Sequence, residues 1–224
     1  MNIPVIYEDN HILIAEKPVN IPSQKDESED DDILTLLKND IKKRYDKPGN
    51  VYLGLVHRLD RPAGGVMVFA RTSKAAARLS SQMRSGGFKK TYMAVVIGKP
   101  ESPKGSLKNF LIKDAKTNTV RTTDKTAGGA KPAMLDYEVV EHTEGLSLVR
   151  INLLTGRPHQ IRVQFSAIGH PLWGDQKYGR DFNKPGQQLA LWAVEIAFDH
   201  PVTKERISFS SPLPVAEPWS IFTR

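Results

Sequence analysis

The strongest constraint on the fold of this chain is a series of short apolar runs of strand type, separated by turn residues. The runs fall in residues 5–18, 64–72, 89–100, 133–154, 187–199 and 206–212. They are rich in Val, Ile, Leu and aromatic residues and are bounded by Gly, Pro, Asn or Asp. Several neighbouring runs are joined by short turns, which favours antiparallel pairing. The pattern predicts an α+β fold with a mixed, mainly antiparallel β-sheet and flanking helices and loops.

Two segments between these runs have helical character. Residues 33–45 place apolar side chains at helical spacing, after an acidic stretch at 26–32 that we interpret as a solvated loop. Residues 73–87 predict a helix that is capped by Thr72 or Ser73 and closed by glycines. No linker clearly separates two domains, so we expect one domain over residues 1–224.

Composition excludes several classes of protein. The chain has no cysteine, which removes disulfides, thiolate catalysis and cysteine-based metal sites together. The N-terminal residues do not resemble a signal peptide, and no apolar run approaches the roughly 20 residues of a membrane helix. A formal net charge of +7 and a pI of about 9.5 favour nucleic acid as a partner, although such a charge also suits a merely soluble basic protein. We expect a cytoplasmic location.

Common cofactor and metal motifs are missing from the sequence. It contains neither a phosphate-binding G-x-x-x-x-G-K-[ST] loop nor a dinucleotide-binding G-x-G-x-x-G turn. The six histidines are scattered singly, which argues against a zinc site. An enzyme of this composition would work without cofactor or metal, using carboxylates, arginines, tyrosines and histidines.

Two polar clusters lie where loops meet regular elements. The first is the segment HRLDR, residues 57–61, and the second is the segment RPHQIR, residues 157–162. The second segment predicts a short helix with Pro158 in its first turn and an apolar stripe that packs on the sheet. If Arg162 meets Asp60, the arginine would keep that carboxylate ionised and suited to act as a nucleophile or base. From spacing alone, a structural ion pair explains the same residues.

The segment HRLDRPAGGVMVFART, residues 57–72, resembles the active-site signature of the RluA-type pseudouridine synthases. Four further blocks resemble that family in the same order along the chain. They are VIYEDNHILIAEKPVNIP, KKTYMAVVIGKP, LLTGRPHQIRVQFSAIGHPLWGDQKYG and FDHPVTKERISFSSPLP. Together the blocks span nearly the whole chain, and we expect no separate N-terminal RNA-binding domain before the first of them.

The resemblance implies an isomerase that converts uridine within RNA to pseudouridine without a cofactor. Asp60 matches the essential aspartate of the family, and Arg162 matches the arginine that forms a salt bridge with it. Tyr92 matches the tyrosine that packs on the flipped base and assists proton transfer at C5. Whether the aspartate attacks C1′, adds to the base or abstracts a proton on the way to a glycal stays open.

The same resemblance indicates substrate-binding residues. Arg58 resembles the residue that enters the RNA stack where the uridine has left, and the neighbouring cations suit phosphate contacts. For the second cluster, pocket shaping, phosphate binding and a purely structural role stay open. The expected substrate-binding set is His57, Arg58, Arg61, Arg157, His159 and Gln160.

Two other functions fit parts of this evidence. A catalytically silent RNA-binding protein would share the fold, but would have no chemical reason to keep Asp60, Tyr92 and Arg162 together. A nucleosidase or glycoside hydrolase would normally use two cooperating carboxylates, and no partner for Asp60 can be named. We therefore expect an RNA pseudouridine synthase acting on structured ribosomal or transfer RNA, as a monomer, with no metal or membrane partner.

Overall fold

A computed structural model describes residues 3–28, 30–143 and 145–222. The chain forms two compact units, residues 1–89 with 193–212 and residues 90–192 with 213–224. The strands and helices of each unit are described separately below.

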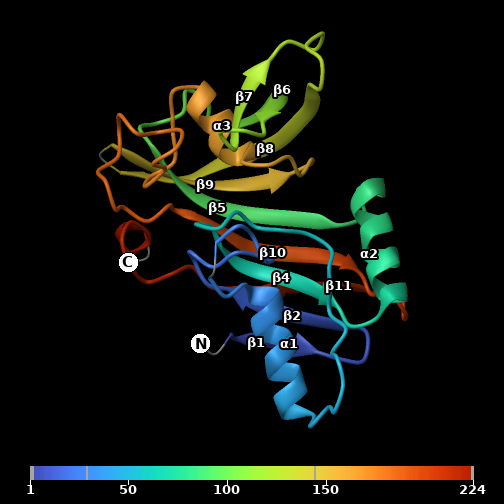
Figure 1. Cartoon of the computed structure of the whole chain (residues 1–224). Coiled ribbons are helices and arrows are strands. Elements are labelled where there is room, and N and C mark those ends of the chain that lie inside the picture. Colours follow the sequence, from blue (N-terminus) through green and yellow to red (C-terminus); the bar gives the residue numbers. More distant parts are fainter. Residues whose placement is uncertain (1–2, 29, 144, 223–224) are drawn as a thin grey trace. The chain divides into compact units, whose positions relative to one another are not determined.

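The strands of the first unit follow the order β1-β2-β4-β10 (Figure 1). In addition, β3 pairs with β4, and β11 pairs with β10. These strands are β1 (Val5–Glu8), β2 (Ile12–Lys17), β3 (Gly54–Leu55), β4 (Gly64–Ala70), β10 (Leu191–Asp199) and β11 (Arg206–Ser210). Asp9 accepts hydrogen bonds from the N–H groups of His11 and Ile12 and so closes the turn between β1 and β2. All seven residues of β4 are buried, which is why this strand is apolar throughout.

Two helices belong to this unit, α1 (Ile33–Arg44) and α2 (Ser73–Ser85). Asp32 caps α1 by accepting from the N–H of Thr35 at 3.0 Å. Thr72, and not Ser73, caps α2 by accepting from the N–H of Ala75, and Gly86 ends this helix in a left-handed conformation.

The second unit has the sheet order β5-β9-β8-β6-β7 (Figure 1). Its strands are β5 (Lys89–Ile97), β6 (Lys104–Asp114), β7 (Thr119–Thr123), β8 (Lys131–Thr143) and β9 (Leu146–Leu153). The pairings β5–β9, β9–β8, β8–β6 and β6–β7 are all antiparallel. Helix α3 (Gln160–Ala167) packs Val163 against Leu111, Val120 and Ala133 of this sheet.

The predicted α+β architecture with a mainly antiparallel sheet is confirmed. One detail of the third helix was wrong. Pro158 lies in the turn before α3 and not in its first turn, because the helix begins only at Gln160. His159, at the N-cap, has a left-handed backbone with φ of 52°. This residue reverses the chain direction between the proline and the helix.

Candidate active site

The loop that carries Asp60 lies between β3 and β4 in the first unit. The Ala63 N–H donates to the Asp60 carbonyl oxygen at 3.0 Å, so residues 60–63 form a tight turn. Just before this turn, the Ser23 hydroxyl forms hydrogen bonds with both backbone polar groups of Leu59. The Ser23 hydroxyl donates to the Leu59 carbonyl at 2.8 Å and accepts from the Leu59 N–H at 3.1 Å. The half-buried Asp60 therefore extends from a backbone that is fixed at its start.

Lys17, at the end of β2, fixes the other side of the same turn. Its side chain is fully buried, and its ammonium donates to the carbonyl oxygens of Arg61 at 3.1 Å and Ala63 at 2.6 Å. A third bond runs to the Pro18 carbonyl at 2.9 Å. Burial lowers the pKa of Lys17 to about 7, although the charge of Asp60 opposes this change. One buried cation thus links the end of a core strand to the turn of the candidate catalytic carboxylate.

Gly65 brings this turn into close contact with the sheet. Its φ of +114° suits glycine, and a Cβ at this position would lie 2.3 Å from the Ala193 carbonyl oxygen. The glycine pair that follows the aspartate in the sequence therefore serves backbone packing between β4 and β10.

The other two predicted residues of the loop have different environments. His57 is partly buried, accepts from the Val68 N–H of β4 at 3.0 Å, and lies 5.6 Å from the ring of Phe88. Arg58 is exposed. The imidazole therefore anchors the loop on the sheet, whereas the guanidinium of Arg58 reaches solvent.

Arg61 is engaged by the acidic segment. Its guanidinium forms an ion pair and hydrogen bond with Asp30, donates to the Ser28 hydroxyl at 3.1 Å and to the Asn20 carbonyl at 3.3 Å, and lies 3.8 Å from Asp26. The interpretation of residues 26–32 as a solvated loop was therefore incomplete. The segment is largely exposed, but it holds a cation of the candidate site, and its last residue caps α1.

The second unit holds the other cluster in the segment before and within α3. Gln160 is buried and closes this segment: its carbonyl oxygen accepts from the Thr155 hydroxyl at 2.7 Å and from the Arg157 N–H at 3.0 Å. Its amide donates to the Met134 carbonyl at 3.0 Å. Arg157 donates from Nε to the Pro132 carbonyl at 2.9 Å. These bonds tie the segment to β8.

Arg162 forms a buried bidentate pair with Asp175. Nε and one terminal nitrogen each lie 2.7 Å from a carboxylate oxygen, and the guanidinium lies 5.1 Å from the ring centre of Tyr178. Burial works against ionisation of Asp175, but the hydrogen bonds and charge of Arg162 lower the pKa of Asp175 below its ordinary value. His159 lies beside the same tyrosine, with Nδ1 2.6 Å from the hydroxyl oxygen. This arrangement fixes the orientation of the arginine.

The predicted site residues fall into two groups. His57, Arg58, Asp60 and Arg61 come together in the first unit. Tyr92, which is buried on β5, lies in the second unit with Arg157, His159, Gln160 and Arg162. Because Asp60 and Arg162 belong to different units, their pairing stays a prediction.

The residues with a structural part in these groups that were not predicted include Lys17, Ser23, Asp175 and Tyr178. Lys17 lies in EKP, and Asp175 and Tyr178 lie in WGDQKYG, within blocks that resemble the family, which was the only available signal. The contacts that position the site join residues far apart in sequence, 46 residues for Lys17 and Ala63 and 13 for Asp175 and Arg162, so no local pattern reveals them.

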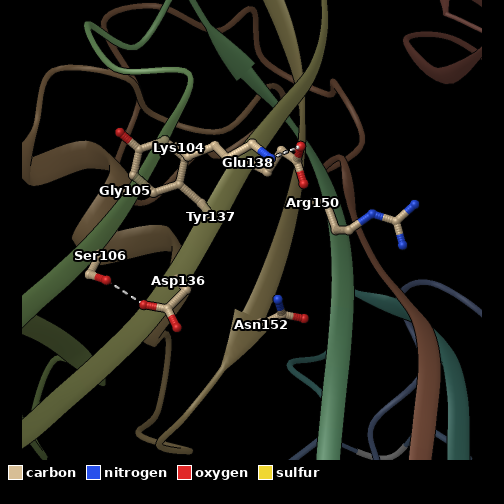
Figure 2. A pocket seen from close by; sticks show the side chains of 8 residues that line it. All are labelled: Lys104, Gly105, Ser106, Asp136, Tyr137, Glu138, Arg150 and Asn152. Carbon is tan, nitrogen blue, oxygen red and sulfur yellow. Dashed lines mark hydrogen bonds and ion pairs between the residues drawn. The ribbon is translucent and has the colours of Figure 1, made fainter.

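A cavity of about 390 Å³ lies over β6, β8 and β9 of the second unit (Figure 2). Its lining residues are Lys104, Gly105, Ser106, Asp136, Tyr137, Glu138, Arg150 and Asn152. Lys104 pairs with Glu138 at 2.8 Å, Ser106 donates to Asp136, and Arg150 extends away from them. No predicted site residue lines this cavity, and its two cations are balanced by two anions. It has no net attraction for a polyanion.

The described residues contain neither a metal-binding cluster nor a helix that could span a membrane. No three His, Cys, Asp or Glu side chains among them come together as a metal site would require. None of the helices that they form has both the length and the apolar character needed to cross a membrane.

Comparisons with known proteins agree with the resemblance in the motifs. The model of a family described as RNA pseudouridylate synthase matches residues 11–167. An uncharacterized RNA pseudouridine synthase, YhcT of Bacillus subtilis (strain 168), is 35% identical over 215 residues, which cover 95% of this chain and 69% of that protein. Ribosomal large subunit pseudouridine synthase D of Pseudomonas aeruginosa is 34% identical over 227 residues, which cover 96% of this chain and 69% of that protein.

Solved structures show the same fold. Human RNA Pseudouridylate Synthase Domain Containing 4 matches with a TM-score of 0.79 at 22% identity, covering 94% of this chain and 88% of that chain. Human RNA Pseudouridylate Synthase Domain Containing 1 matches with a TM-score of 0.74 at 24% identity, covering 96% and 85%.

Proposed function

The chain belongs to the RNA pseudouridylate synthase family, of the RluA type, and we propose that Asp60 is the carboxylate with which it isomerises uridines in structured RNA. The enzyme is an isomerase. The reaction breaks the N1–C1′ bond of a uridine, turns the uracil and joins C5 to C1′, so no atom is gained or lost. The proposed substrate is ribosomal RNA, in line with the relatives named for the large ribosomal subunit, or transfer RNA.

The observation that carries the proposal is the fixed turn of Asp60. Ser23 and Lys17 hold its backbone before and after the aspartate with bonds of 2.6–3.1 Å. A carboxylate that must meet one atom of a flipped nucleotide benefits from such fixation, because correct positioning supplies a large part of an enzyme's rate enhancement.

The charge distribution supports RNA as the substrate. The second unit has 16 Lys and Arg against 10 Asp and Glu, so it carries +6 of the formal net charge of +7. Residues 104–131, which form β6, β7 and their connections, have seven Lys and Arg against two Asp. Such a basic hairpin attracts the phosphate backbone independently of sequence and makes binding salt-dependent.

Roles for the remaining residues follow from their environments. Tyr92 packs on the extruded uracil, and Arg162 stabilises the charge of Asp60 while Asp175 fixes its orientation. Arg58, which is exposed, fills the gap left in the RNA stack, which offsets part of the few kcal/mol of unstacking.

The other predicted substrate-binding residues divide by their contacts. The bonds of Gln160 and Arg157 to the backbone around β8 favour pocket shaping over phosphate binding. His57 supports the loop, and Arg61 is available to RNA only after it leaves the acidic segment. We propose that the chain is one catalytic domain that acts as a monomer in the cytoplasm, where it would meet ribosomal or transfer RNA.

The test is pseudouridine formation by the purified protein. Wild type, Asp60→Asn and the control Asp46→Asn, which changes an exposed acid of the same unit, are each incubated with unmodified cellular RNA. Pseudouridine is then mapped by chemical labelling, and free uracil is measured in parallel.

We expect pseudouridine from wild type and Asp46→Asn, and none from Asp60→Asn. Equal modification by wild type and Asp60→Asn would refute the assignment of Asp60. RNA binding without modification by wild type would instead support a silent binding protein, and uracil release would support a hydrolase.

A further inference from the structure

Lys90 is a cation of β5 to which the proposed mechanism gives no task. It lies two residues before Tyr92, and side chains two apart on a strand point to the same face of the sheet. Its side chain is partly buried, whereas that of the neighbouring Lys89 is exposed. Lys90 therefore shares a strand face with the tyrosine that we propose to hold the flipped base.

The Lys90 ammonium lies close to Gly156. A Cβ built on Gly156 would meet Nζ of Lys90 at 3.1 Å and no other atom within 4 Å. The ammonium thus lies against the backbone of the segment that leads to α3. This is the segment whose conformation Gln160 fixes through Thr155 and Arg157.

No hydrogen bond or ion pair to this ammonium is formed by the residues that the structure describes. Burial lowers the pKa of Lys90, and no neighbouring charge contributes to this change. The buried cations Lys17 and Arg162 are different, because Lys17 has three carbonyl partners and Arg162 has a carboxylate. The Lys90 ammonium has lost part of its hydration without gaining a protein partner, so an anion that binds it would offset this partial loss.

We propose that Lys90 binds a backbone phosphate of the RNA next to the target uridine, a role that rests on the proposed function. Phosphates are the anions that RNA supplies, and a lysine binds them as a point charge without a demanding geometry. Since Lys90 and Tyr92 share a strand face, the phosphate belongs to the extruded nucleotide or to its direct neighbour. The glycine at position 156 leaves the space in which the ammonium lies.

The test compares Lys90→Met with Lys89→Met, which removes the same charge from the adjacent exposed position. Binding of a short RNA that contains a modified uridine site is measured from low to moderate salt, together with kcat and KM for pseudouridine formation. Lys90→Met should weaken binding by about tenfold or more at low salt and flatten the slope of log K against log salt by about 0.7–0.9. Lys90→Arg should restore most of the binding. Equal effects of the Lys89 and Lys90 changes would overturn the proposal.

Two further measurements separate contact from general electrostatics. One measurement uses RNA with a single neutral methylphosphonate beside the target uridine. Wild type should bind this RNA more weakly than it binds unmodified RNA. Lys90→Met should bind the two RNAs equally well. Gly156→Ala keeps the charge and requires the ammonium to shift by only a few tenths of an ångström, so it should weaken RNA binding less than Lys90→Met does. If the losses of binding free energy from the neutral linkage and from Lys90→Met add up at every flanking phosphate tested, Lys90 contacts none of those phosphates and the proposal is wrong.

Stability distinguishes binding from a structural role. Because the ammonium has no partner in the described structure, Lys90→Met should unfold in urea at the same concentration as Lys89→Met or at a higher one. A lower midpoint would make Lys90 structural and overturn the proposal. If wild type binds this RNA through Lys90 but forms no pseudouridine in any RNA, the proposed function fails while the phosphate contact stands.

Discussion

Lys17 offers a quantitative test of how the turn of Asp60 is held. Replacing it with methionine removes the buried ammonium but keeps a side chain of similar length. The three carbonyl oxygens that it binds then lose their donor, which costs about 1–3 kcal/mol for each group left unsatisfied. In the opposite direction, the substitution removes the penalty for burying a charge. These two effects are similar in size, so the overall change in stability at one pH is a poor test.

The pH dependence separates the two effects. Burial lowers the pKa of Lys17 from 10.5 to about 7. Below pH 7, where Lys17 is charged in both states, this change destabilises the folded protein by about 5 kcal/mol. Between these two pKa values the unfolded chain binds a proton that the native protein does not bind. The free energy of unfolding of wild type therefore rises with pH in this window, by up to ~1.4 kcal/mol per pH unit. Methionine has no proton to bind and cannot contribute this slope.

The assay is urea unfolding of wild type, Lys17→Met and Lys25→Met at pH 6.5, 7.5, 8.5 and 9.5. Other titrating groups cancel when each variant is subtracted from wild type. Relative to Lys17→Met, wild type should gain about 2–3 kcal/mol of unfolding free energy between pH 7.5 and 9.5. Lys25, which is exposed, should show no such gain. If the free energy of unfolding changes with pH in the same way for wild type and Lys17→Met over the whole range, the lowered pKa of Lys17 is refuted.

Two further predictions concern the ion pairs of the site residues. Asp30→Asn releases Arg61 from its acidic partner and should strengthen RNA binding at low salt severalfold in gel-shift titrations. Asp31→Asn, which changes an exposed acid of the same segment, should strengthen binding less. Equal effects of the two changes would mean that only net charge matters. Arg162→Met leaves the carboxylate of Asp175 buried without its arginine. Urea unfolding should show a free energy of unfolding that is lower by about 3–5 kcal/mol. A loss below about 1 kcal/mol would show that the pair is dispensable for folding.

The parts of the fold that local patterns determine could be predicted. Apolar runs and turn residues located most of the strands, because alternation and turn chemistry act over a few residues. Strands β3, β6 and β7 lie outside those runs, in more polar stretches of the sequence. Thr72 and the glycines after residue 85 marked α2 for the same reason. The prediction for Pro158 was wrong because a proline fits the first turn of a helix, and only the left-handed backbone of His159 moved the start to Gln160.

The contacts of the site were mostly beyond prediction from sequence. A lysine at the end of an apolar strand is ordinarily exposed, so nothing local indicated that Lys17 binds a turn 44 residues away. Arg61 looked available for phosphate because its acidic partners lie about 31 residues earlier in a polar segment. The family resemblance named the candidate catalytic residues, but it did not reveal which groups orient them.

The cations of the two motif-bearing segments therefore differ in how readily an RNA phosphate can reach them. The Lys17 ammonium is saturated by three carbonyls and buried, so it acts on the backbone of the turn and not on RNA. The Arg61 guanidinium is exposed but held by carboxylates, so a phosphate must compete with Asp30 for it, which weakens binding of RNA that does not fit closely. Lys90 has no such competitor among the described residues, and a phosphate placed there relieves an existing penalty. RNA should therefore gain more binding free energy at Lys90 than at Arg61, and the effect of Lys90→Met on binding should exceed that of Arg61→Met.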